Sequence, residues 1–98
     1  MNKENEAKAL INDLLTAELV ANASLHIKNV IYRIDRGVLV ANSHVVITAQ
    51  TRAVLFSEIQ GYIKKLHGEH VPLYSLPITQ ANDSFDALIR NHTKKILV

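Results

Sequence analysis

The sequence contains no cysteine and no tryptophan, and only two prolines and three glycines occur among its 98 residues. The absence of cysteine excludes disulfides, thiolate metal sites and cysteine nucleophiles, and it is compatible with a reducing cytoplasm. The chain is 48% hydrophobic and 20% charged, which is not the composition of a disordered segment. We therefore expect a single domain over residues 1–98 that is folded nearly throughout.

Long apolar runs and a strong charge of one sign are also missing. No apolar stretch approaches the roughly 18 residues of a membrane span, and the polar start from Met1 to Glu6 does not resemble a signal peptide. The formal net charge is only +2, so the pI of about 9.0 is a weak indication of nucleic-acid binding. We expect a cytoplasmic protein without a membrane partner.

Motifs for catalysis are not found either. The sequence has no glycine-rich phosphate loop, no nucleophile elbow and no His-Glu-x-x-His helix. Acidic pairs such as Asp83 and Asp86 fall where they are explained by helix capping. The sequence therefore predicts a binding protein rather than an enzyme.

The first half of the chain shows two periodicities. Apolar residues at helical spacing predict an amphipathic helix from about Glu4 to Val20. From Asn22 the period changes to two, and a parity switch around Lys28-Asn29 indicates a bulge. Asp35-Arg36-Gly37 predicts a hairpin turn. The second strand, Val38 to Gln50, is apolar on both faces, so it is expected to be central or to lie in an interface.

The second half predicts three shorter elements and a tail. Thr51 is a candidate cap for a helix that ends at Gly68. Val71 to Ile78 is expected to be an edge or bulged strand, because its two prolines cannot donate to a sheet. Asn82 or Asp83 can cap a third helix, and Lys94 to Val98 is a short β-prone run. The predicted order is α-β-β-α-β-α-β.

An ordered set of segments resembles the CutA-type divalent-cation tolerance proteins. The segments are Ala23-Ser24-Leu25-His26-Ile27, Val30-Ile31-Tyr32-Arg33-Ile34 with Gly37, Val45 to Thr51, Leu66 to Pro72, Leu76-Pro77-Ile78, and Phe85-Asp86-Ala87-Leu88-Ile89. The resemblance implies an α+β, ferredoxin-like sandwich and a homotrimer in which long hairpins pair across subunits. It also implies a link to tolerance of divalent metal ions such as copper. The doubly apolar hairpin independently favours an oligomer.

The resemblance places a strand before the first helix, and the tail resembles that strand. Lys94 to Val98 would restore the strand-to-helix order if the chain were circularly permuted, with the tail filling a vacant slot in its own or a neighbouring subunit. Deleting these residues is then expected to unfold or dissociate the protein.

Three single residues and one three-residue segment depart from the pattern of the family. Ser24 replaces a cysteine discussed as a copper ligand, Ile34 replaces a tryptophan, Gln50 replaces a lysine, and Gly68-Glu69-His70 replaces Pro-Tyr-Glu. These changes favour a second interpretation, a scaffold trimer without the ligand site of the family.

Histidine is the natural metal ligand to consider in a chain without cysteine. His67 and His70 flank Glu69 just after a helix end, and nitrogen and oxygen ligands of this kind suit Cu(II) or Zn(II). The structural alternative for His67 is a favourable position against the dipole at a helix C-terminus.

Tyr32 and Arg33 are the candidate ligand-binding residues. The resemblance places them at a cleft between subunits, where the guanidinium fork of Arg33 suits an anion or another small ligand. The alternative is that Tyr32 packs in an interface and that Arg33 forms a surface ion pair.

RNA binding by the sheet is the third interpretation. It requires aromatic side chains on the sheet for base stacking. The sequence has three tyrosines and two phenylalanines and no aromatic-rich strand, so we expect no nucleic-acid partner.

Overall fold

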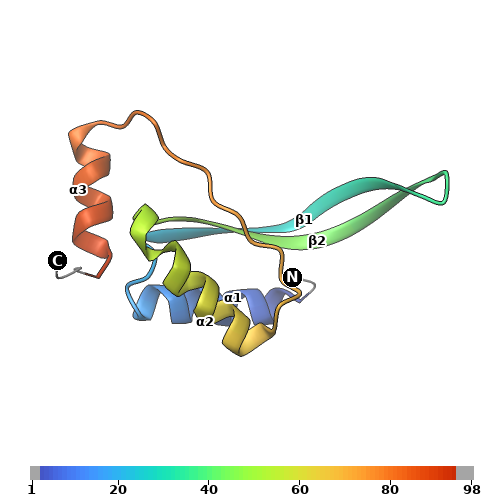
Figure 1. Ribbon diagram of the computed structural model, residues 1–98, viewed down its shortest axis with the longest axis horizontal. Helices are drawn as coiled ribbons and strands as arrows, with labels where there is room; N and C mark the ends of the chain where they lie inside the picture. The colour runs from blue at the N-terminus through green and yellow to red at the C-terminus, as the bar shows by residue number, and fades with distance from the viewer. Residues whose placement is uncertain (1–2, 95–98) are drawn as a thin grey trace.

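The computed structural model describes residues 3–94 as an α+β fold with one long hairpin and three helices (Figure 1). The molecule is elongated, about 50 × 30 × 22 Å, because the hairpin projects beyond the helices. The elements are α1 (Glu4–Thr16), β1 (Asn22–Asp35), β2 (Val38–Gln50), a 3₁₀ turn η1 (Ala53–Leu55), α2 (Phe56–His67) and α3 (Asp83–His92).

The first helix, α1, is confirmed but ends four residues earlier than its apolar pattern predicts. Glu18 has a φ of 58°. The N–H of Leu19 donates to the carbonyl of Leu14, and the N–H of Glu18 donates to the carbonyl of Leu15. This is a Schellman motif, which usually has glycine at the position that Glu18 occupies. The pattern continues past the helix because Leu19 and Val20 are also buried, although they lie outside it.

The hairpin is confirmed together with its turn and its bulge. β1 and β2 pair antiparallel from Asn22 opposite Gln50 to Asp35 opposite Val38. The two loop residues, Arg36 and Gly37, both have positive φ, as the twist of a tight hairpin requires. The register shifts between His26 and Asn29, where the parity switch predicts the bulge.

One face of the hairpin base packs against α1 and α2. A core cluster joins both helices, η1 and the loop before β1, and Ile47 of β2 packs against it. In Figure 1, α2 passes in front of α1, and both helices lie mainly below the strands. The buried residues of the cluster are Leu10, Leu14, Leu19, Val20, Leu55, Ile59 and Ile63.

The predicted cap at Thr51 is wrong. The hydroxyl of Thr51 donates instead to the carbonyl of Leu19 at 2.5 Å, and α2 begins at Phe56 after the 3₁₀ turn. A local sequence pattern cannot distinguish a capping hydroxyl from one that binds a backbone group 32 residues away. The end of α2 is as predicted, because Gly68 follows it with a φ of 79°.

The predicted strand from Val71 to Ile78 does not form. The structure has no regular element between α2 and α3, and the sheet in residues 3–94 contains only β1 and β2. Pro72 and Pro77 have no N–H, and no strand within residues 3–94 pairs with the segment. The full α-β-β-α-β-α-β order of a ferredoxin-like sandwich is therefore not reproduced within residues 3–94.

The third helix is confirmed, and Asn82 rather than Asp83 is its cap. The Oδ1 of Asn82 accepts from the backbone N–H of Phe85 at 2.9 Å. The predicted final strand, Lys94 to Val98, lies outside the described residues except for Lys94.

Candidate functional site

The three predicted metal ligands lie together along the chain at the end of α2. His67 is the last residue of the helix and is half-buried, whereas Glu69 and His70 are exposed in the turn that follows. The positive φ of Gly68 makes the chain leave the helix axis here. The three side chains therefore come from a helix end and a turn, and no hydrogen bond within residues 3–94 joins any two of them.

The carboxylate of Glu69 already has a partner. Lys64 of α2 forms an ion pair with it, with Nζ and Oε1 2.8 Å apart, and both side chains are largely exposed. Within residues 3–94, no three His, Cys, Asp or Glu side chains are grouped closely enough to hold a metal ion. A metal at this turn would thus have to compete with Lys64 and find further ligands elsewhere.

Tyr32 and Arg33 lie on β1 toward the tip of the hairpin. They are paired with Ala41 and Val40, and successive residues of a strand point to opposite faces. Within one chain the two side chains therefore cannot contact the same ligand. Arg33 is exposed and makes no ion pair within the described residues.

The outer part of the hairpin, residues 29–44, is here called the distal hairpin. Its apolar side chains are not covered by the rest of the chain: Tyr32 and Leu39 are each 65% exposed and Ile34 is 68% exposed. These three share one face, and Ile31, Val38 and Val40 share the other. An exposed apolar surface of this extent is typical of an interaction site.

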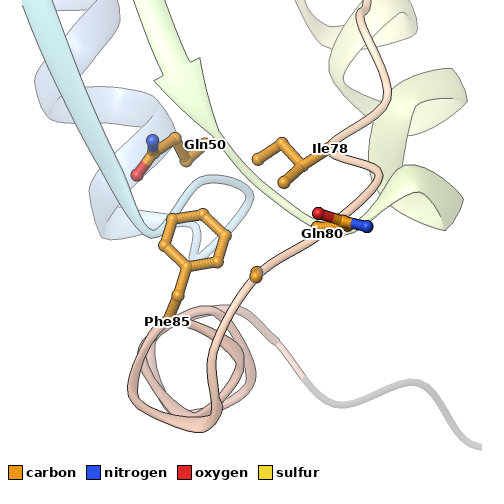
Figure 2. A pocket seen from close by; sticks show the side chains of 5 residues that line it. Gln50, Ile78, Gln80 and Phe85 are labelled. Carbon is orange, nitrogen blue, oxygen red and sulfur yellow. The ribbon is translucent and has the colours of Figure 1, made fainter.

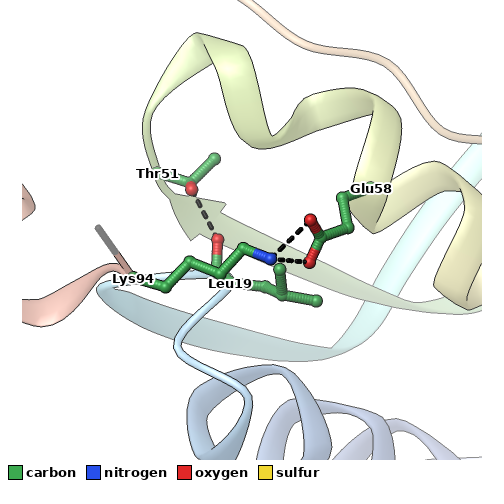
Figure 3. A network of polar contacts seen from close by, with 4 residues as sticks. All are labelled: Leu19, Thr51, Glu58 and Lys94. Atoms are coloured by element: carbon green, nitrogen blue, oxygen red, sulfur yellow. Dashed lines mark hydrogen bonds and ion pairs between the residues drawn. The ribbon is translucent and has the colours of Figure 1, made fainter. Parts of the chain in front are cut away.

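A group of polar contacts that the sequence does not reveal closes the opposite end of the molecule (Figure 3). The N–H of Lys94 donates to the carbonyl of Glu18 at 2.8 Å, and its ammonium pairs with Glu58 of α2. Thr51 binds the adjacent carbonyl of Leu19. Nη2 of Arg52 donates to the carbonyl of Arg90 near the end of α3 at 2.9 Å. These contacts, referred to below as the base network, fix the end of α3 beside the end of β2.

An open cavity of about 310 Å³ lies beside the same end of β2. Figure 2 shows Phe85 of α3 and Ile78 pointing into the gap next to Gln50. The amide of Gln50 is turned toward β1, where Nδ2 of Asn22 donates to its Oε1 at 2.8 Å. The lining is completed by Gln80 and Ala81.

Comparison with known proteins places this arrangement in a family. Residues 1–92 match the family described as CutA1 divalent ion tolerance protein. The chain belongs to the CutA1 divalent ion tolerance family. No curated protein sequence is significantly similar to it.

Solved CutA1 structures share the fold of the chain. A variant of CutA1 from Pyrococcus horikoshii has a TM-score of 0.82 at 24% identity, covering 97% of this chain and 93% of that one. The divalent cation tolerance protein of Thermus thermophilus has a TM-score of 0.81 at 21% identity, covering 96% and 92%. A CutA from Archaeoglobus fulgidus, described as periplasmic, has a TM-score of 0.79 at 20% identity, covering 94% and 90%. At these identities the likeness concerns the fold.

No helix within residues 3–94 is long and apolar enough to cross a membrane.

Proposed function

We propose that this CutA1-family chain is a homotrimeric binding protein, not an enzyme, and that it takes up a divalent metal ion or another small ligand at clefts between subunits. The observation that carries the proposal is the distal hairpin, which exposes apolar side chains on both faces. Association of hairpins would bury these faces. Each Å² of apolar surface removed from water would favour the association by about 25 cal/mol.

Trimerisation would also decide which candidate ligand-binding residues lie together. Tyr32 and Arg33 point to opposite faces within one subunit, so a shared cleft would have to combine Tyr32 of one subunit with Arg33 of another. We propose that Arg33 supplies charge-assisted donors to an anionic ligand there and that Tyr32 forms an apolar wall.

For the metal, we propose Cu(II) or Zn(II) bound by His67, Glu69 and His70, completed by ligands from a neighbouring subunit. Calorimetric titration with each ion should give a stoichiometric site, and His67→Ala or His70→Ala should weaken it at least tenfold. His92→Ala, an exposed histidine on α3, is the matched control and should leave the affinity unchanged.

The second candidate is a scaffold trimer without a metal site. It is favoured by the Lys64 to Glu69 ion pair and by the lack of a three-ligand group within residues 3–94. Binding that His67→Ala and His70→Ala leave unchanged would contradict a metal site at this turn. The absence of any stoichiometric binding would contradict it as well and would support the scaffold.

A further inference from the structure

The face of the hairpin that points away from the helices carries a pair of histidines. Val45 is buried and Ile47 packs against the core, so these residues of β2 point toward the helices. Successive residues of a strand alternate, so His44 and Val46 point to the opposite face, here called the outer face. His26 of β1 is the direct partner of Val46 and lies on the outer face as well. The two histidines thus come from different strands and share one surface.

The bulge in β1 lies between the two histidines. His44 is the partner of Asn29. The register shift separates this pair from the pair of His26 and Val46. His26 and His44 are therefore diagonal neighbours, and such neighbours are about 7–8 Å apart in antiparallel strands. A metal ion held about 2 Å from one nitrogen of each imidazole fits between side chains at this spacing.

No strong contact within residues 3–94 holds either imidazole away from a metal ion. His26 is exposed and His44 is half-buried, and neither forms an ion pair there. The one side-chain hydrogen bond of these rings in that part of the chain joins Nε2 of His26 and Oγ1 of Thr48, which are 3.3 Å apart. It is long and exposed, so turning the ring away from Thr48 costs little. At the end of α2, by contrast, Lys64 already occupies the carboxylate of Glu69.

We propose that His26 and His44 bind one Cu(II) ion on the outer face, with the side-chain carbonyl of Asn29 and water as further ligands. Among the divalent first-row metals, Cu(II) binds nitrogen ligands most strongly, and its tetragonal geometry accepts imidazole nitrogens together with oxygen ligands. The bound ion connects β1 and β2 at the bulge, where the ladder of backbone hydrogen bonds is disrupted. The inference rests on the register and the bulge, and it depends neither on the trimer nor on the metal site at the end of α2.

The test uses the full chain carrying His67→Ala and His70→Ala, which removes the other candidate site. Calorimetric titration of this background variant with Cu(II) should give one ion per chain, and the addition of His26→Ala or His44→Ala should weaken binding at least tenfold. His92→Ala, on exposed α3, is the matched control and should leave the affinity unchanged. Electron paramagnetic resonance of the bound Cu(II) should show two imidazole nitrogens in the background variant and one after either substitution.

Three results would overturn the proposal. They are no Cu(II) binding by the background variant, binding that His26→Ala or His44→Ala leaves unchanged, and a bound ion with fewer than two imidazole nitrogens. Far-UV circular dichroism should be the same for all variants, because both histidines lie on the surface of the sheet, so a loss of affinity reports on the ligands and not on folding. The reverse background, His26→Ala with His44→Ala, tests the site at the end of α2 separately.

Discussion

The two ends of the hairpin contain similar residues in very different surroundings. At the base, Ile47 packs against a cluster built from α1, η1 and α2. In the distal hairpin, Ile34 and Leu39 are each more than 60% exposed, although they belong to the same pair of strands. The difference shows that the chain provides a core for the base alone. The distal hairpin has the composition of a buried sheet, which supports the proposed association with another molecule.

The largest effect is expected in the core of the base. Leu14→Ala removes a side chain that is 3% exposed, and it should lower the free energy of unfolding by about 2–5 kcal/mol. Leu15→Ala, next to it on α1 but 40% exposed, is the matched control and should cost less than half as much. Urea denaturation measures both. Equal losses would mean that the base is not the main source of stability.

A charge in the distal hairpin should affect assembly rather than folding. Ile34→Asp places a carboxylate in the proposed interface and should weaken association at least tenfold, which corresponds to about 1.4 kcal/mol. Sedimentation equilibrium measures the association, and far-UV circular dichroism should stay unchanged. Ala9→Asp, at an exposed position on α1, is the control. An unchanged mass for Ile34→Asp would contradict an interface at this position.

The smallest effect is expected in the base network. Glu58 and Lys94 are both substantially exposed, so a double-mutant cycle of Glu58→Gln and Lys94→Met should give a coupling energy of about 0.2–1 kcal/mol. The cycle is measured by urea denaturation. A coupling energy of zero would mean that this pair does not help to hold the end of α3 against the base.

Local patterns in the sequence are sufficient to predict the hairpin and the helices. Helical spacing predicts α1, the change to period two predicts β1, and Gly37 and Gly68 mark a turn and a helix end where positive φ is found. The bulge between His26 and Asn29 is predicted by the switch of the apolar residues from odd to even positions along the strand. In each case the signal lies within a few residues of the feature.

Contacts between distant residues could not be predicted in this way. Thr51 binds Leu19, and Lys94 pairs with Glu58, 36 positions away, and no local pattern records either contact. Segment 71–78 has the sequence of an edge strand, but a strand also requires a neighbour, which propensity does not specify. Among the predicted site residues, His67, Glu69 and His70 are close along the chain, and their role, like that of Tyr32 and Arg33, stays a prediction.

Light scattering coupled to size exclusion on the unmodified protein tests the central claim most directly. The proposed homotrimer predicts a particle with the mass of three 10.9 kDa chains. A particle with the mass of one chain would contradict the account, because the apolar faces of residues 29–44 would then be stable in water without a partner.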